Sequence, residues 1–436
     1  MVVRPASQGI AVRDRGGAPL ARVLVDLTPL EPGAAQGGLK PLTLELIDEL
    51  SRLAPDVEFT VFGAAGSAGE GFDGRTNVRW ILESADTDAE PPSESLRSRL
   101  FRAGGGALPG ALRRKLLEGA WARGSQAACH PAAIADPPDV VFSPLMGVRF
   151  YTLGAPVVAT IPDIQFHDHP EFFPDENRWF RQWLVKMACR YATRIVCISD
   201  HALSRLQQEY GIPRERLERI YPVRRPEMPP TVRDTAESPA VLGFKGRRYL
   251  LYPANYWPHK NHGNLLTALR LYCDRHPHDD LGLVLTGADG GNGPRIDNEI
   301  ERLRLREHVI TAGYVSQSRL QALLLGASAL VFPSLYEGFG MPVLEALAAG
   351  VPVLCSASTS LPEVAGDAAI YFDPQDPSDI AQAIEQLLSE PALAARLRAE
   401  GPKRASIFGN VEDMARRYLE TLQTAHRCGS LVTTPR

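Results

Sequence analysis

The stretch "FPSLYEGFGMPVLEALAAGVPVL", residues 332–354, decides the fold. An apolar run, "ALVFPS", leads into it and a second run, "VPVL", closes it, so we interpret both as buried strands of a parallel sheet joined by a crossover. Pro342 suits the first helical position, where its missing N–H costs nothing, and Gly350 suits the position after the last turn. The stretch therefore predicts a strand, a glycine-rich turn, a helix over about 342–349 and a second strand.

The glycine-rich turn predicts a site for an anion. Gly338 and Gly340 precede the helix, where backbone N–H groups lack partners and the positive end of the helix dipole points outward, an arrangement that binds phosphate. Glu337 precedes the turn and Glu345 lies one turn into the helix, so the two carboxylates can flank a diphosphate from its two ends. Carboxylates bind hydroxyls better than phosphates, which predicts a ribose–diphosphate–sugar layout. The alternative is a plain glycine turn with two solvent-facing glutamates.

Composition and charge narrow the class of protein. The 436 residues are 44% hydrophobic and 22% charged, which is typical of a folded protein with two or three domains. A formal net charge of −4 gives no global basic field, so we expect no nucleic acid partner. The six cysteines form no CxxC pair, and no run reaches the ~18 apolar residues of a membrane span. We expect a cytoplasmic protein, at most peripheral at the inner face of the membrane.

The order of apolar runs predicts an α/β fold in two halves. From residue 22 onward, short β-branched runs alternate with helical patterns, as in βαβ units. Residues 226–246 are rich in proline and charge and lack periodicity, which indicates a linker between domains 1–225 and 247–405; a last helix and tail occupy 406–436. Two doubly wound, Rossmann-like parallel-sheet domains would then face a shared cleft.

Residues 64–127 do not fit this alternation. They are rich in Gly, Ala and Ser and carry an excess of basic side chains: Arg97, Arg99, Arg102, Arg113, Arg114, Lys115 and Arg123. One interpretation is a solvated, irregular insertion. The other is a basic amphipathic surface over 97–123 for an anionic or lipid-linked acceptor at a membrane.

Several segments resemble one family. "EGFGMPVLEALAAGVPVLCSASTSLPEVAGDAAIYFDP" resembles the E-x7-E donor region of the family-4 retaining glycosyltransferases of GT-B fold. Four further segments resemble other motifs of that family: "QGGLKPLTLELIDELS", "IPDIQFHDHPEFF", "RIVCISDHALSRL" and "ANYWPHKNHGNLLTAL". The resemblance covers about 22–425 apart from 64–127. It implies the GT-B fold, with an acceptor-binding N-terminal domain, a nucleotide-sugar-binding C-terminal domain and a C-terminal helix that returns to the N-terminal domain.

The resemblance also implies roles for particular residues. Glu337 would contact hydroxyls of the donor sugar, Glu345 would bind the ribose, and Lys260 would neutralise the departing diphosphate. Asp163 matches the family's aspartate in the loop of the N-terminal domain, and the resemblance implies that Lys260, Glu337 and Asp163 are catalytic. The remaining residues expected at the donor are Gly338, Phe339 and Gly340 at the diphosphate, Gly37 and Gly38 near the phosphate or the acceptor, and Gly313, Tyr314 and Val315 at the base.

The sequence departs from the family pattern in two places. An arginine is frequent five or six residues before the lysine, where this chain has Ala254 and Asn255. Histidines stand in many relatives where this chain has Pro162 and Phe166. His167 and His169 lie nearby and either serve a sugar or are incidental.

We expect no metal. A cluster of His167, Asp168, His169 and Glu171 is disfavoured because alternate residues of one loop rarely converge on an ion. "DTD" at 86–88 falls in the irregular insertion, with no strand before it. Lys260 and the helix N–H groups would take the part of a cation, so no cofactor is expected beyond the donor substrate.

The resemblance implies a retaining transfer of a hexose, with mannose favoured, from a nucleoside diphosphate sugar. The acceptor would be a hydroxyl of a glycan or lipid-linked molecule in surface polysaccharide biosynthesis. One alternative is a catalytically atypical nucleotide-sugar-binding protein or pseudoglycosyltransferase, which the missing arginine and histidines favour. A nicotinamide-dependent oxidoreductase is disfavoured because "GADGGNG" and "GFGMPV" lack the GxGxxG spacing, and a glycan-binding module would need no phosphate site.

Overall fold

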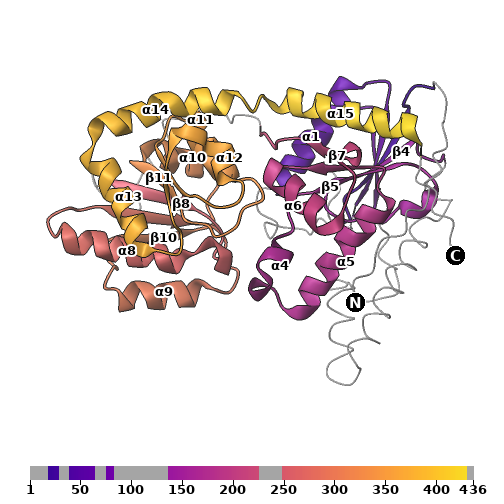
Figure 1. Cartoon of the computed structure of the whole chain (residues 1–436). Coiled ribbons are helices and arrows are strands. Elements are labelled where there is room, and N and C mark those ends of the chain that lie inside the picture. Colours follow the sequence, from indigo (N-terminus) through magenta and orange to yellow (C-terminus); the bar gives the residue numbers. More distant parts are fainter. Residues whose placement is uncertain (1–17, 29–38, 64–74, 83–135, 225–247, 430–436) are drawn as a thin grey trace, which may run out of the picture.

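Two parallel β-sheets, each flanked by helices, form two lobes of the chain (Figure 1). The structure is a computed structural model that describes residues 18–28, 39–63, 75–82, 136–224 and 248–429. The predicted linker, Gly37 and Gly38, the DTD triplet and the basic segment 97–123 lie outside these ranges.

The first sheet has the strand order β3-β2-β1-β4-β5-β6-β7, and every neighbouring pair is parallel. Its central strands are short apolar runs buried on both faces, as expected where helices cover both sides of a parallel sheet. The strands are β1 (Arg22–Asp26), β2 (Glu58–Gly63), β3 (Val78–Leu82), β4 (Val140–Ser143), β5 (Val157–Ile161), β6 (Arg194–Cys197) and β7 (Leu217–Arg219). The helices are α1 (Leu39–Leu53), α4 (Gln165–Asp168), α5 (Asp175–Tyr191) and α6 (Asp200–Tyr210), with short 3-10 turns η1 (Tyr151–Leu153), η2 (Pro170–Phe172) and η3 (Arg214–Arg216).

The second sheet has the order β10-β9-β8-β11-β12-β13, again all parallel. Its strands are β8 (Tyr249–Pro253), β9 (Gly282–Thr286), β10 (Val309–Gly313), β11 (Ala329–Phe332), β12 (Val353–Ser356) and β13 (Ala369–Phe372). The helices are α8 (His262–Arg275), α9 (Gly293–Arg302), α10 (Gln317–Gly326), α11 (Met341–Ala348), α12 (Leu361–Ala365), α13 (Pro377–Ser389) and α14 (Pro391–Ser406), with 3-10 turns η4 (Pro258–Lys260) and η5 (Gly366–Ala368). A further helix, α15 (Val411–Cys428), follows α14. The strand order reverses between β8 and β11, which makes their carboxyl ends the expected place for a ligand.

The last helix, α15, returns to the first lobe. Figure 1 shows α14 over the second lobe and α15, in yellow, over the first. Tyr418 and Leu422 are buried in the core on one face of the first sheet. The Tyr418 ring lies 5.5 Å from that of Phe142, and its hydroxyl lies 3.3 Å from Thr160 Oγ1. The predictions of two doubly wound lobes and of a returning C-terminal helix are confirmed.

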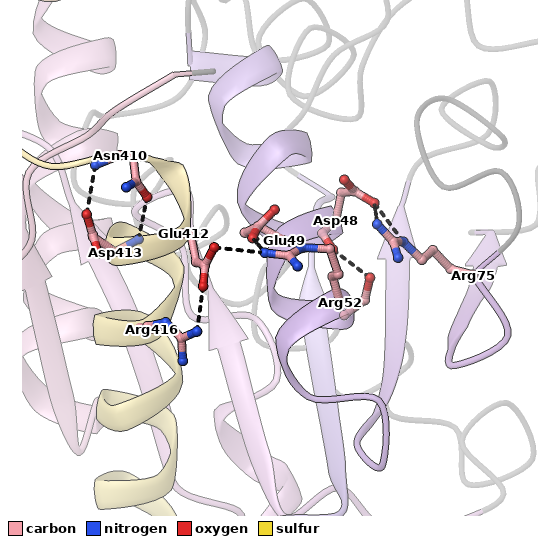
Figure 2. A network of polar contacts seen from close by, with 9 residues as sticks. Asp48, Glu49, Arg52, Arg75, Asn410, Glu412, Asp413 and Arg416 are labelled. Atoms are coloured by element: carbon pink, nitrogen blue, oxygen red, sulfur yellow. Dashed lines mark hydrogen bonds and ion pairs between the residues drawn. The ribbon is translucent and has the colours of Figure 1, made fainter. Parts of the chain in front are cut away.

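A polar network lines the start of α15 where it meets α1 (Figure 2). Asn410 and Asp413 form a capping box, in which each side chain accepts a hydrogen bond from the backbone N–H of the other. Glu412 lies 3.2 Å from Arg52 of α1, and both side chains are more than 40% exposed. An exposed ion pair contributes at most about 1 kcal/mol, so the buried apolar side chains hold α15 in place.

The structure corrects the sequence interpretation in three edge regions. Part of the segment predicted to be irregular, residues 75–82, contains strand β3 at one edge of the first sheet. Strands β7 and β13, at an edge of each sheet, were also not predicted. The predicted helix over 342–349 is found as α11, shifted by one residue. In the described ranges, none of the helices has both the length and the apolar character needed to cross a bilayer.

Replacing Leu422 by Ala should lower the free energy of unfolding by about 2–5 kcal/mol, because the side chain is fully buried against the first sheet. Urea unfolding followed by circular dichroism measures this loss. Leu325→Ala is the matched control, since Leu325 is 50% exposed on α10, and its effect should stay within about 0.5 kcal/mol. Equal losses in the two variants would contradict the packing of α15 described above.

Candidate active site

The predicted donor residues gather at the carboxyl ends of β8 and β11, where the strand order reverses. Lys260 ends the turn η4 that follows β8, and Glu337 begins the glycine turn that follows β11. Backbone contacts hold the two loops together: the Leu335 N–H donates to the His259 carbonyl at 2.8 Å. The Tyr252 hydroxyl donates to the Lys260 carbonyl at 2.5 Å. A backbone hydrogen bond therefore joins the loops that carry Lys260 and Glu337, and Tyr252 of β8 holds the Lys260 backbone.

Lys260 and Glu337 form an ion pair with 2.6 Å between Nζ and Oε1. Their side chains are 13% and 12% exposed, so most of both charges is withdrawn from water. The Lys260 ammonium also lies 5.6 Å from the centre of the Phe332 ring. Removing one member of such a pair leaves the other charge uncompensated, which costs far more than losing an exposed pair. Glu337 thus holds the Lys260 cation in place beside the glycine turn.

Three hydroxyl contacts orient the glycine turn. Ser360 Oγ donates to the carbonyls of Glu337 at 3.0 Å and Phe339 at 2.9 Å, and Ser199 Oγ donates to that of Gly338 at 2.7 Å. In a trans peptide the N–H of the next residue points opposite to the carbonyl. The N–H groups of Gly338 and Gly340 therefore point away from Ser360, and the Phe339 N–H points away from Ser199.

These three N–H groups remain available for a ligand, since within the described residues they donate no hydrogen bond. They precede α11, whose positive dipole end adds to the attraction for an anion.

Both glycines of the turn are required by close contacts. Gly340 has φ of +105°, a conformation that only glycine adopts without strain. A Cβ there would also lie 2.6 Å from Leu361 Cδ2. A Cβ on Gly338 would lie 2.9 Å from the Pro162 carbonyl oxygen of the first lobe. The turn is therefore packed against both α12 and the loop after β5.

Asp163 reaches the same place from the first lobe. It follows β5, accepts a hydrogen bond from the Gln165 N–H at 3.0 Å and lies against Gly338. Burial raises the pKa of Asp163 above its usual value, and the charge of Glu337 acts in the same direction. The Gln165 N–H and the charges of Arg181 and Lys260 act against this rise. The structure thus brings together all three residues predicted to be catalytic.

Ala254 and Asn255, which stand where relatives often have an arginine, pack against the loop that follows β9. The Asn255 side chain accepts a hydrogen bond from the Ala288 N–H at 2.8 Å, and a Cβ on Gly287 would lie 2.3 Å from the Ala254 carbonyl oxygen. The loops after β8 and β9 therefore touch directly where a longer side chain would otherwise extend. Nearby, burial followed by the charge of Lys260 lowers the pKa of His259 to about 3, so this histidine is neutral at pH 7 and adds no positive charge.

Arg181 is a cation that sequence reasoning missed. It lies on α5, and nothing in the sequence pattern distinguishes it from the other basic residues of that helix. Its guanidinium lies 5.3 Å from the centre of the Phe173 ring in the first lobe, and its charge opposes the rise in the pKa of Asp163 and contributes to the lowered pKa of His259.

His167 and His169, which were considered as part of a metal cluster, contact different residues in the structure. His167 Nε2 lies 3.1 Å from Glu209 on α6, and Asp168 pairs with Arg205. The His169 ring stacks on Phe172 at 5.2 Å and meets the Tyr336 ring of the second lobe edge-on at 5.7 Å. Only His169 of the two therefore contacts the second lobe in the described structure.

The remaining predicted residues lie around the same end of the second sheet. Gly313 ends β10 with φ of +63°, and Tyr314 after it is 71% exposed, so its ring is accessible to a ligand. Glu345 lies on α11, one turn from its start. The Phe339 side chain is buried, which leaves its backbone as the part that faces a ligand.

Two family models match the chain, one on each lobe. The model described as Glycosyltransferase Family 4 matches residues 36–226, and the model described as Glycosyl transferases group 1 matches residues 234–404. The O-antigen chain mannosyltransferase B of Escherichia coli is 32% identical over 254 residues, which is 58% of this chain and 66% of that protein. The MMP alpha-(1->4)-mannosyltransferase of Mycolicibacterium hassiacum is 29% identical over 267 residues, covering 58% and 61%. The chain thus spans slightly less than two thirds of each relative.

Solved structures of similar fold cover nearly the whole chain. Sucrose-phosphate synthase from Thermosynechococcus elongatus has a TM-score of 0.70 at 18% identity, covering 93% of this chain and 98% of that one. Anabaena HepE in complex with UDP and glucose has a TM-score of 0.65 at 17% identity, covering 93% and 100%. At such identities the likeness shows the fold alone. This likeness shows the GT-B fold, and the two family models together show that the chain belongs to family 4 of the glycosyltransferases.

Proposed function

We propose that the protein transfers a hexose, with mannose favoured, from a nucleoside diphosphate sugar to a hydroxyl of a glycan or lipid-linked acceptor, with retention of configuration. The observation that carries this proposal is the Lys260–Glu337 pair beside the available N–H groups of Gly338, Phe339 and Gly340. A cation and the start of a helix together suit a diphosphate, and a carboxylate at their edge suits sugar hydroxyls.

The same residues support a route for the chemistry. As the bond between the anomeric carbon and the phosphate oxygen breaks, its electron pair moves to the departing diphosphate. Lys260 and the N–H groups of the turn stabilise that charge, so the step requires no metal ion. The departing phosphate accepts the proton of the acceptor hydroxyl on the same face while the new C–O bond forms. Glu337 and Asp163 hold sugar hydroxyls and form no bond to the anomeric carbon.

Mannose is favoured because both curated relatives reported above are mannosyltransferases, and one is described as acting on the O-antigen chain. This relationship supports a place in surface polysaccharide synthesis. We propose in addition that the protein acts at the cytoplasmic side of the membrane. The structural neighbour HepE is described with UDP and with UDP-glucose, so a uridine donor is included among the nucleotide sugars to be tested. The basic segment 97–123, outside the described residues, remains our proposal for contact with the membrane.

One observation favours a second candidate, a nucleotide-sugar-binding protein without transferase activity. Ala254 and Asn255 pack against the loop after β9, and His259 is neutral, so none of these three residues adds a positive charge to that of Lys260. Such a protein would bind the donor and release no nucleoside diphosphate in the presence of acceptor.

A thermal unfolding screen with GDP-mannose, UDP-glucose, ADP-glucose and dTDP-glucose tests the proposal. A donor that binds the native state should raise Tm, because a ligand at 100 times its Kd stabilises that state by about 2.7 kcal/mol. GDP-mannose should raise Tm most, because mannose is the favoured sugar. Release of GDP with acceptor separates transferase from binding protein, and NMR of the product gives its anomeric configuration. Inversion would contradict the mechanism, and no stabilisation by any of the four would contradict the donor site.

Lys260→Met should lower kcat by about 10²–10³-fold, the effect typical of removing one donor that stabilises charge in a transition state. Steady-state release of nucleoside diphosphate measures it, with circular dichroism to verify folding, because Glu337 is left without its partner. Lys403→Met is the control, since this lysine is 70% exposed on α14. Unchanged kcat in folded Lys260→Met would show that Lys260 does not stabilise the departing diphosphate.

Glu345→Gln should act on donor affinity. If Glu345 binds the ribose hydroxyls, losing a charged hydrogen-bond acceptor should raise the donor KM about tenfold while kcat stays within a few-fold. Initial rates at varied donor concentration separate the two constants. A fall in kcat at constant KM would assign Glu345 to the chemical step instead.

A further inference from the structure

The start of helix α6, in the first lobe, contacts the glycine turn of the second lobe. Ser199 is the N-cap of this helix and is fully buried. Its oxygen accepts a hydrogen bond from the Ala202 N–H at 3.0 Å, and its hydroxyl donates to the Gly338 carbonyl of the second lobe at 2.7 Å. One side chain therefore caps a helix of the first lobe and holds a peptide of the donor turn.

A carboxylate of the second lobe binds the same helix end. Glu363 Oε1 accepts from the Asp200 N–H at 2.6 Å, and Oε2 accepts from the His201 N–H at 3.1 Å. Charged acceptors at a helix N-terminus form strong hydrogen bonds and also interact favourably with the helix dipole. The first three N–H groups of α6 are thus bound by Ser199 and by a residue of the other lobe.

Glu363 belongs to the same small unit as the donor turn. It lies on α12, whose first residue, Leu361, packs against Gly340, while Ser360 before it binds the turn's carbonyls. Contact between Glu363 and α6 therefore sets the distance between Ser199 and Gly338. Asp200 is exposed, so water can solvate these N–H groups when the lobes separate.

We propose that Ser199 and Glu363 are positioning residues for the donor diphosphate. Contact of α6 with the second lobe holds the Gly338 carbonyl toward Ser199 and so keeps the Phe339 N–H pointing away from Ser199, available to the donor. The phosphate-binding turn is then complete only while the lobes touch. The positioning of the lobes by this contact stands on the geometry alone, whereas its effect on the ligand rests on the function proposed above.

Hydrogen exchange without ligand tests the contact itself. In Glu363→Ala, the amides of residues 200–202 should exchange at least about tenfold faster than in the wild type, since two of them lose their acceptor. Glu420→Ala, at an exposed position of α15, is the control and should leave this exchange unchanged. Equal exchange in Glu363→Ala and the wild type would overturn the contact, whatever the protein binds.

Kinetics with GDP-mannose test the positioning role. Ser199→Ala should raise the donor KM about tenfold, the effect of one lost hydrogen bond, and Ser199→Thr, which keeps the hydroxyl, should restore it. Ser406→Ala, an exposed serine on α14, is the matched control. A lower Tm with unchanged KM in Ser199→Ala would show a helix cap only and overturn the proposal. If the wild type neither binds nor uses GDP-mannose, the proposed function fails, while the exchange experiment still decides the contact.

Discussion

The ion pair between Lys260 and Glu337 is the interaction on which the site depends. It joins the loops that follow the two central strands of the second sheet, β8 and β11, and it fixes a cation where the strand order reverses. Because both side chains are mostly withdrawn from water, each charge needs the other until a ligand provides further partners. The neighbouring backbone hydrogen bond from Leu335 to His259 also joins these two loops.

The remaining contacts place the first lobe against that pair. The chain crosses from the second lobe to the first before α15, which buries Tyr418 and Leu422 in the core of the first lobe. The start of α6 then meets the donor turn through Ser199 and Glu363. Apolar burial thus holds the lobes together at one end, while a few directional hydrogen bonds join them at the site. Such an arrangement suits a cleft whose two walls must adjust to a substrate.

Much of the fold could be predicted from the sequence because its signals are local. Pro342 and Gly350 gave the ends of α11 within one residue, and apolar runs gave the central strands of both sheets. Strands β3, β7 and β13 were missed because each lies at a sheet edge, where fewer apolar residues are needed. Residues of the site were identified through the family resemblance, but their contacts were not: Lys260 and Glu337 are 77 positions apart. Ser199 and Glu363 form hydrogen bonds between the two lobes, and periodicity within one element does not indicate such contacts.

The most direct measurement is a crystal structure of the wild-type protein with an intact sugar nucleotide, GDP-mannose first. The account predicts both phosphates at the start of α11, with oxygens about 3 Å from the N–H groups of Gly338, Phe339 and Gly340 and from Lys260 Nζ. Diphosphate density elsewhere, with the glycine turn and the Lys260–Glu337 pair unchanged and facing solvent, would contradict it.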